Sequence, residues 1–209
     1  AKVEQKSARI IGKIVTASRK QLGKSKSAMA EHYIKQYYKN VPPDDLATRK
    51  PEQWADLALN HLKISETRKS GKDCVRVFNP QLENEGWGLG KTSLEIVTED
   101  MPFLVDSVTA ELNRQEVDVQ ILVHPIMTVL RTPAGKLRDV VDRRTNETDA
   151  LRESFMHIEF TRLKAARLKE IKQRIEKVIQ DVRYAVEDWR GMRHRMWTLI
   201  EEYETSSVP

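Results

Sequence analysis

The stretch TSLEIVTEDMPFLVDSV, residues 92–108, decides the fold. Its first part, TSLEIVT, combines β-branched and alternating apolar residues and predicts a strand over 92–98. An acidic, proline-containing loop comes next. A helix over 101–115 then follows from apolar residues at helical spacing, which are Leu104, Val105, Val108 and Leu112. The stretch therefore predicts a strand that passes through a short loop into a helix.

Glycines stand before this strand in the order that a phosphate-binding loop uses: Gly86, Gly88 and Gly90, followed by Lys91 and Thr92. A Walker loop has four residues between its first glycine and the Gly-Lys-Thr, whereas only three lie between Gly86 and Gly90. Such a loop also follows a strand and opens a helix, but this stretch precedes a strand. We therefore interpret the glycines as part of a hairpin connection between strands at 74–78 and 92–98.

Apolar periodicity divides the chain into a helical segment over 1–71 and a mixed segment over 72–190. The helical segment contains expected helices over 4–22 and 28–39, joined by a linker, and a third that opens at Pro51. Further strands are expected over 74–78, 117–131, 136–141 and 153–161, with a tight turn at 132–135. Because Pro125 cannot donate a ladder hydrogen bond, we expect a bulge or a sheet edge there.

A long helix is predicted after the last strand. Its apolar residues alternate at spacings of three and four, which gives a seam formed by Leu168, Ile171, Ile175, Val178, Val182, Ala185 and Trp189. Packing of this seam on the sheet is favoured over a free coiled coil, because the preceding strand needs a cover. Gly191 predicts a break, with a further helix over 192–203 in a C-terminal segment over 191–209.

The composition argues against membrane and secreted proteins. The 209 residues contain no apolar run near the roughly 18 residues that span a bilayer, and no apolar signal-peptide core opens the chain. The single cysteine, Cys74, leaves no partner for an internal disulfide and fits a reducing compartment. We expect a cytoplasmic protein without a membrane partner.

Positive charge is concentrated at the N-terminus. Residues 1–30 hold eight Lys/Arg and one Glu, a net charge of +7, so that the other residues sum to −2 within the total of +5. A basic arm can bind nucleic acid. We favour a solvated helix face instead, because the neighbouring aromatic residues Tyr33, Tyr37 and Tyr38 all lie beyond the arm. Nucleic acid is therefore an unlikely partner.

Catalytic and metal-binding patterns are weak. No two of the five histidines, His32, His61, His124, His157 and His194, are four residues apart. His157 and Glu159 come nearest to a ligand pair, and a cross-strand polar contact is the favoured interpretation. Ser107 lacks the G-x-S-x-G context of a nucleophile. We assign no catalytic, cofactor-binding or metal-binding residue, and expect the tryptophans to serve core or interface packing: Trp54, Trp87, Trp189 and Trp197.

The loop Glu99-Asp100-Met101-Pro102-Phe103-Leu104-Val105 resembles the first loop of ACT domains, small βαββαβ modules that bind amino acids and regulate metabolic enzymes. ACT domains carry an acidic residue, a proline, a glycine and two aliphatic residues there, and Phe103 stands in place of the glycine. The resemblance implies an effector-binding loop formed by Glu99, Asp100, Pro102, Phe103 and Asp106. Helix capping and dipole complementarity are the alternative, favoured interpretation of Asp100 and Asp106.

The same resemblance implies an α+β fold, in which an N-terminal helical segment precedes an ACT-like antiparallel sheet covered by helices. The closing strand of an ACT domain has no counterpart after the long helix. We expect the strand at 74–78 to take its place, adjacent and antiparallel to 92–98, which gives a permuted ferredoxin-like sheet. Helices over 102–115 and 163–189 are expected to cover one face of that sheet.

Longer stretches resemble the large bacterial NAD-dependent glutamate dehydrogenases, and residues 94–114 are the most specific part. The matching pieces are HYIKQYYKNVPPDDLATRKPEQW, VRVFNP, GWGLGKTSLEIVTEDMPFLVDSVTAELNR and ILVHPIMTVLR. The likeness implies the ACT-like regulatory and assembly portion of a homo-oligomeric enzyme that oxidises L-glutamate to 2-oxoglutarate and ammonium. NAD would bind to the remainder of the same polypeptide, because no G-x-G-x-x-G opens a helix here. A stand-alone amino-acid-binding domain is the alternative.

Overall fold

A computed structural model describes residues 2–22, 27–87, 90–142 and 148–205. The helices are α1 (Lys2–Gln21), α2 (Ser27–Tyr38), α3 (Pro43–Leu46), α4 (Pro51–Ile64), α5 (Leu82–Glu85), α6 (Leu104–Arg114) and α7 (Ala165–Thr205). The strands are β1 (Cys74–Phe78), β2 (Lys91–Glu99), β3 (Val119–Val123), β4 (Ile126–Arg131), β5 (Leu137–Val141) and β6 (Ala150–Thr161). Gly88, one of the hairpin glycines, lies outside these ranges, as does most of the linker over 23–27.

The sheet confirms the permuted order expected for an ACT-like domain. Its strand order is β1-β2-β6-β4-β5, with β3 paired to β6, and the pairs between these strands are antiparallel. The early strand β1 lies beside β2, with Cys74 opposite Val97 and Phe78 opposite Ser93. It therefore occupies the edge position that the closing strand of an ACT domain would take.

Pro125 divides the long strand that the sequence predicts over 117–131. β3 and β4 both pair with β6, and between them the Phe155 backbone N–H donates to the Pro125 carbonyl over 3.0 Å. His124, the residue before Pro125, also contacts β6: its Nε2 lies 2.7 Å from Oγ of Ser154. The expected irregularity is confirmed, because a proline keeps its carbonyl as an acceptor but has no N–H to donate.

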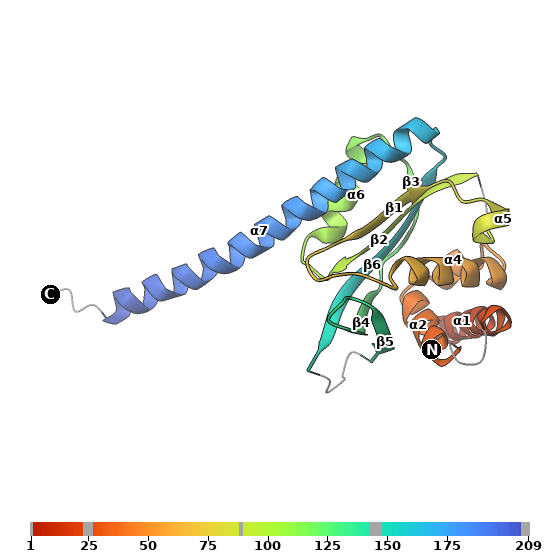
Figure 1. The fold of residues 1–209 in the computed structure, drawn as a ribbon, viewed down its shortest axis with the longest axis horizontal. Helices are drawn as coiled ribbons and strands as arrows, with labels where there is room; N and C mark the ends of the chain where they lie inside the picture. Colours follow the sequence, from red (N-terminus) through yellow and green to blue (C-terminus); the bar gives the residue numbers. More distant parts are fainter. Residues whose placement is uncertain (1, 23–26, 88–89, 143–147, 206–209) are drawn as a thin grey trace.

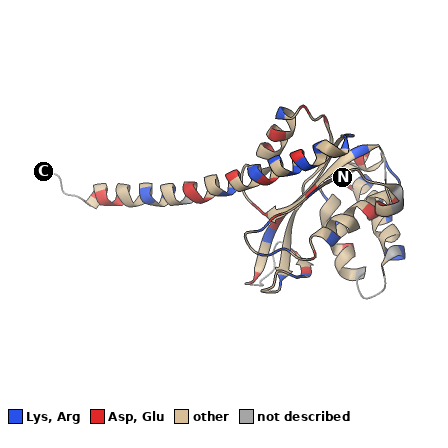
Figure 2. Ribbon diagram, turned by 45° about the horizontal axis from the view of Figure 1, so that its top comes forward, with Lys and Arg blue, Asp and Glu red and all other residues tan. Residues whose placement is uncertain are grey.

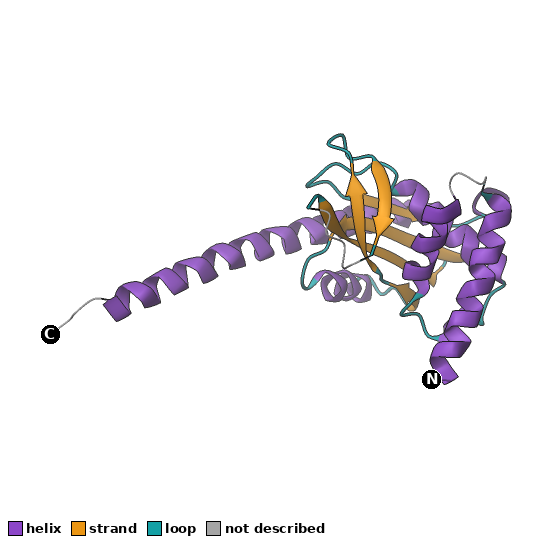
Figure 3. Cartoon of the chain, turned by 90° about the horizontal axis from the view of Figure 1, so that it is seen from below, coloured by secondary structure: helices purple, strands orange, loops and turns teal. Residues whose placement is uncertain are grey.

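Helices cover both faces of the sheet (Figure 1 and Figure 3). On one face, α6 and α7 bury a core with Leu94 and Ile96 of β2 and Ile158 of β6, as predicted. On the opposite face, α1, α2 and α4 pack in a second core that includes Val97 and Phe155. The predicted N-terminal helical segment thus also covers the sheet. The division into segments over 1–71, 72–190 and 191–209 stays a prediction.

The predicted break at Gly191 is wrong, because α7 runs without interruption from Ala165 to Thr205 and extends far beyond the sheet (Figure 1). One glycine costs a helix interior about 1 kcal/mol relative to alanine, which helical residues on both sides offset. Only part of the predicted apolar seam of this helix packs against the sheet. The buried α7 residues are Ile171, Ile175, Ile179, Val182 and Val186, whereas Ala185 and Trp189 are exposed.

Residues 2–21 of the basic arm form the amphipathic helix α1. Its apolar side packs inward through Ile14 and Val15. On its outer side, Lys6 Nζ lies 2.6 Å from Asp44 Oδ1. This arrangement agrees with a solvated helix face. No helix in the described part of the chain is both long and apolar enough to cross a membrane.

Candidate functional site

The loop between β2 and α6 has an unusual backbone at Phe103, which has φ 65° and ψ −2°. This left-handed region is one that glycine enters freely and that other residues enter at a cost. The loop therefore keeps a glycine-type conformation at the position where ACT domains usually carry glycine. α6 begins at Leu104, so Pro102 lies before the helix. The helix predicted from Met101 therefore begins three residues later than expected.

The three acidic residues of the predicted effector site have different surroundings. Asp100 Oδ2 lies 2.8 Å from Arg152 Nη2, and no side chain caps the start of α6. The capping interpretation of Asp100 is therefore wrong. Asp106 lies exposed in the first turn of α6, where the helix dipole favours a negative charge. Glu99 Oε1 accepts a hydrogen bond from the Gly71 backbone N–H over 3.0 Å. Of the five predicted effector residues, Pro102, Phe103 and Asp106 thus remain exposed.

A groove of about 510 Å³ lies between α6 and α7, and Phe103 is one of its lining residues. Ser107 and Ala110 of α6 line it together with Val178, Val182 and Ala185 of α7. The polar lining residues are Glu111, Arg114 and Asp181. The predicted loop therefore adjoins a largely apolar groove.

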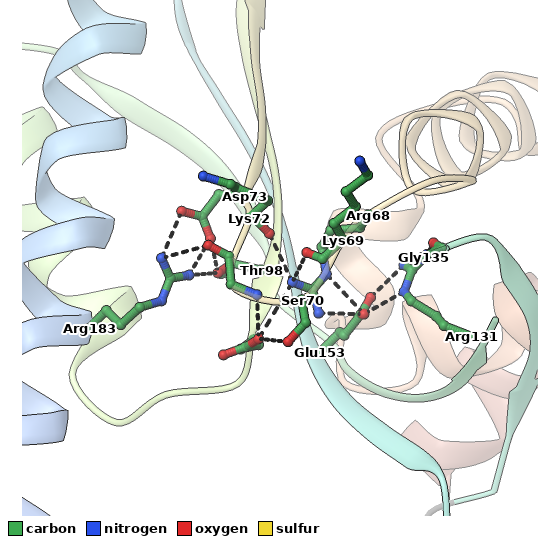
Figure 4. Close-up of polar contacts among 12 residues, drawn as sticks. Arg68, Lys69, Ser70, Lys72, Asp73, Thr98, Arg131, Gly135, Glu153 and Arg183 are labelled. Atoms are coloured by element: carbon green, nitrogen blue, oxygen red, sulfur yellow. Dashed lines mark hydrogen bonds and ion pairs between the residues drawn. The ribbon is translucent and has the colours of Figure 1, made fainter. Parts of the chain in front are cut away.

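α7 is fixed beside the loop by a polar contact of Arg183 (Figure 4). Arg183 Nη2 donates to Asp73 Oδ1 over 2.6 Å and lies 3.4 Å from Thr98 Oγ1 at the end of β2. The hydrogen bond with Asp73 raises the pKa of Arg183. This contact joins α7, the segment before β1 and the strand that leads into the loop.

A second cluster centres on the buried carboxylate of Glu153, which also appears in Figure 4. Arg131 approaches it at 2.6 Å (Nε to Oε1) and 2.7 Å (Nη2 to Oε2), and Arg68 Nη2 lies 2.8 Å from Oε1. Arg131 Nη1 also donates to the Ser65 and Gly135 carbonyls, each over 2.9 Å. The cluster joins β6, β4 and the segment after α4.

A third buried cluster lies between the sheet and the N-terminal helices and consists of Arg49, Glu95, His157 and Glu159. Arg49 pairs with Glu159 through two hydrogen bonds, one of them 2.7 Å long. His157 Nε2 lies 3.1 Å from Glu159 Oε1, and its Nδ1 lies 3.6 Å from Glu95 Oε1, an ion-pair distance without a hydrogen bond. When His157 is protonated, its charge and that of Arg49 match the charges of the two carboxylates. Two further cations lie nearby, with Arg76 Nη1 3.9 Å from Glu95 Oε2 and Lys91 Nζ 3.9 Å from Glu159 Oε2.

The pKa values agree with that charge state. Burial opposes the charged form of His157, but the hydrogen bond with Glu159 and the charges of both carboxylates raise its pKa above the ordinary value. Burial likewise opposes the charge of Glu159, whose pKa nevertheless falls to about 2 beside His157 and Arg49. His157 and Glu159 lie on the same strand, so their contact runs along β6 and is not the cross-strand contact that the sequence predicts. The cross-strand neighbour of His157 is Glu95 of β2.

His61 of α4 connects this region to the sheet. Its Nε2 lies 3.2 Å from the Ile96 carbonyl, and its Nδ1 lies 2.7 Å from the Tyr37 hydroxyl. The carbonyl is only an acceptor, so Nε2 carries the proton and Nδ1 accepts from Tyr37. Burial is the main reason that the pKa of His61 falls to about 4.

Sequence reasoning missed these clusters because their arginines lie far from their partners in the chain. Arg49 and Glu159 are separated by 110 positions, as are Asp73 and Arg183. The available signal was the presence of Glu95, Glu153 and Glu159 within otherwise apolar strands, since buried acids need partners. No group of three or more potential ligand side chains within the described ranges is placed to hold a metal ion.

The family model and three relatives that match this chain agree with one another, because each is a glutamate dehydrogenase or a domain of one. A family model described as "Glutamate dehydrogenase, ACT1 domain" matches residues 33–175. An NAD-specific glutamate dehydrogenase of Halomonas elongata is 33% identical over 186 residues, and one of Pseudomonas aeruginosa is 28% identical over 186 residues. Both alignments cover 88% of this chain but only 12% of the relative.

A third relative, the NAD-specific glutamate dehydrogenase of Mycobacterium tuberculosis, is 26% identical over 148 residues, which are 70% of this chain and 9% of that protein. No solved structure matches the chain. The family match spans the segment from α2 into α7 and includes the left-handed loop. The chain belongs to the glutamate dehydrogenase ACT1 domain family.

Proposed function

We propose that this chain is the N-terminal regulatory and assembly portion of a large NAD-dependent glutamate dehydrogenase. The longer enzyme oxidises L-glutamate to 2-oxoglutarate and ammonium, with NAD as the hydride acceptor, in the cytoplasm. The 209 residues themselves provide no catalytic group and no NAD site. Their partners are the remainder of the same polypeptide and further copies of the enzyme, and neither a membrane nor nucleic acid takes part.

The observation that carries the proposal is the family match across the ACT-like sheet and its two covering helices. The architecture supports the non-catalytic assignment. A dinucleotide site uses a parallel strand followed by a glycine-rich turn and a helix. The strand that leads into α6 instead pairs antiparallel with both of its neighbours, and its loop contains no glycine.

The β2–α6 loop is proposed to receive an amino-acid effector. The exposed Asp106 carboxylate is available to the effector's ammonium group, and the N-terminus of α6 attracts its carboxylate. Arg152 contacts the same loop, where it forms an ion pair with Asp100. An effector bound here would contact α6 directly and, through the shared groove, α7.

Calorimetric titration of the chain with a panel of amino acids tests this role. We expect saturable binding of at least one amino acid and loss of that binding in Asp106→Ala. The matched control is Asp118→Ala, which removes an exposed acid outside the loop and should leave the binding unchanged. Absence of binding across the panel, or equal losses in both variants, contradicts the effector role.

A stand-alone amino-acid-binding ACT-like protein is the second candidate, and the loop geometry favours it equally. The parent reading frame separates the two. A frame that continues into a dinucleotide-binding region supports the first proposal, whereas a frame that closes near Pro209 supports the second.

A further inference from the structure

α7 carries a second apolar face, which starts within the face that packs on the sheet, at Val178 and the buried Val182, and continues beyond it. Beyond Val186 the helix leaves the body of the protein (Figure 1). The residues of the second face alternate at spacings of four and three without interruption: Val178, Val182, Ala185, Trp189, Met192, Met196, Leu199 and Tyr203. That spacing is the seam of a left-handed coiled coil.

Most of this seam is exposed. Trp189 is 56% exposed, Met192 61% and Met196 53%, although all three are large apolar side chains. A contiguous patch of this kind marks an interaction site. The inner residues Val178, Val182 and Ala185 of the same seam line the groove between α6 and α7. Seam and groove therefore form one continuous surface, from Phe103 at the loop to the end of α7.

We propose that this surface binds a second copy of the chain, with the two α7 helices antiparallel. Trp189 of each copy then lies opposite Met192 of the other. The layers outward from that centre pair Ala185 with Met196, Val182 with Leu199, and Val178 with Tyr203. Each of these outer layers combines a smaller side chain with a larger one, so the layers fill to similar volumes as close packing requires.

The second copy is favoured because the surface is complementary to itself. The exposed outer half of α7 from one copy lies over the groove of the other, and each seam residue meets another seam residue. A parallel pair would instead bring groove against groove and body against body. It would also place Ala185 opposite Ala185 and Trp189 opposite Trp189, so that a layer of two small side chains would stand next to a layer of two large ones.

Charges beside the seam support the antiparallel register. Asp188 and Arg195 occupy the same flank of the seam as Asp181 and Glu202. In the proposed pair, Asp188 of each copy lies near Arg195 of the other, which gives two symmetric ion pairs. Asp181 and Glu202 also approach each other, but Asp181 already has Lys177 Nζ at 3.1 Å. Figure 2 shows basic and acidic residues along α7. Such rim charges set register more than affinity.

Sedimentation equilibrium of the chain at several concentrations tests the surface. We expect a reversible dimer, and a dissociation constant raised about 100-fold or more in Met196→Glu, because that variant buries two like charges at the interface. His194→Glu is the matched control: His194 is exposed and lies roughly 160° around the helix from both Met192 and Met196. It should leave the dimer intact. Circular dichroism should show equal helix content in all three proteins.

Cysteine cross-linking tests the direction, in a Cys74→Ser background. Antiparallel pairing predicts an intermolecular disulfide in the double variant Ala185→Cys/Met196→Cys but not in either single variant. A monomer at every concentration, or a dimer that Met196→Glu does not weaken, overturns the proposed surface. A disulfide in the single variant Ala185→Cys overturns the antiparallel arrangement. The inference rests on the assembly role in the proposed function, which names further copies of the enzyme as partners. A monomeric chain would leave the effector role and the non-catalytic assignment standing, because these tests use neither glutamate nor amino acids.

Discussion

Arg183 of α7 and Asp73, just before β1, form an ion pair with 2.6 Å between Nη2 and Oδ1. The contact links the covering helix to the edge of the sheet, and Thr98 shares it from the strand that leads into the predicted effector loop. Both charged side chains are 16% exposed, so the pair is mostly screened from water by protein. Its position makes it the polar anchor of α7 next to the loop.

Removing this anchor should loosen α7. We expect Arg183→Met to lower the free energy of unfolding by about 1–2 kcal/mol, because hydrogen bonds to a charged group are lost while partial exposure limits the cost. Urea unfolding measures the change, with Arg174→Met, an exposed arginine of the same helix, as control. In a double-mutant cycle, Asp73→Asn should add little to Arg183→Met. Fully additive losses would show that the pair is not coupled.

The left-handed Phe103 should respond to glycine. Phe103→Gly relieves a backbone cost of about 1–2 kcal/mol, which the greater freedom of glycine in the unfolded chain offsets in part. A net stabilisation of about 0.5–1 kcal/mol is expected, since Phe103 is 67% exposed and its side chain contributes little packing. Thermal unfolding of Phe103→Gly beside Phe103→Ala checks this. Equal or lower stability of the glycine variant would argue against strain at this residue.

The carboxylate of Glu153 should be essential to stability. Glu153→Gln leaves the buried Arg131 without a counter-charge and leaves the buried Arg68 with only Glu99 Oε1, which lies 3.8 Å from its Nη1. We expect a loss of about 3–5 kcal/mol in the free energy of unfolding. The exposed Glu170, which lies 3.3 Å from Arg167, provides the control Glu170→Gln, for which a change below about 0.5 kcal/mol is expected. Similar urea midpoints for the two variants would contradict the role given to this cluster.

His61 should make the fold sensitive to mild acid. Its folded pKa of about 4 lies below the ordinary 6.5, so the unfolded chain binds the proton more tightly and stability falls as pH falls between these values. The expected loss from pH 6.5 to 4.5 is about 2 kcal/mol. His157 has a raised pKa, so its contribution is present below pH 6.5 and is lost as pH rises through the folded value.

Unfolding curves at several pH values measure this slope, and His61→Gln should reduce it. A slope that is unchanged in His61→Gln would assign the acid sensitivity to other groups. The carboxylates do not imitate the effect in this window, because Glu159 has a lowered pKa and its contribution declines only below the ordinary value of 4.5.

Much of the sheet was predictable from local patterns. The β-branched residues of β2 predict a strand, and Pro125 predicts an irregularity, which lies between β3 and β4. Both features are found. The α4 stripe through Trp54 and His61 is buried as its spacing predicts. These features depend on neighbouring residues, so a sequence pattern contains the information.

Features that depend on distant residues were not predictable. The left-handed Phe103 follows from the whole loop geometry, since phenylalanine itself disfavours that conformation. The start of α6 at Leu104 and the free course of α7 past Gly191 likewise depend on context. The arginine clusters require knowledge of which strands and helices meet, and periodicity does not supply that knowledge.

The central claim is that this ACT-like region serves a glutamate dehydrogenase without performing its chemistry. The most direct measurement is NADH formation by the folded 209-residue chain with L-glutamate and NAD, beside the longer enzyme that contains it. We expect turnover by the longer enzyme and none by the chain. A rate of NADH formation that depends on glutamate and increases with the concentration of the chain alone would contradict it.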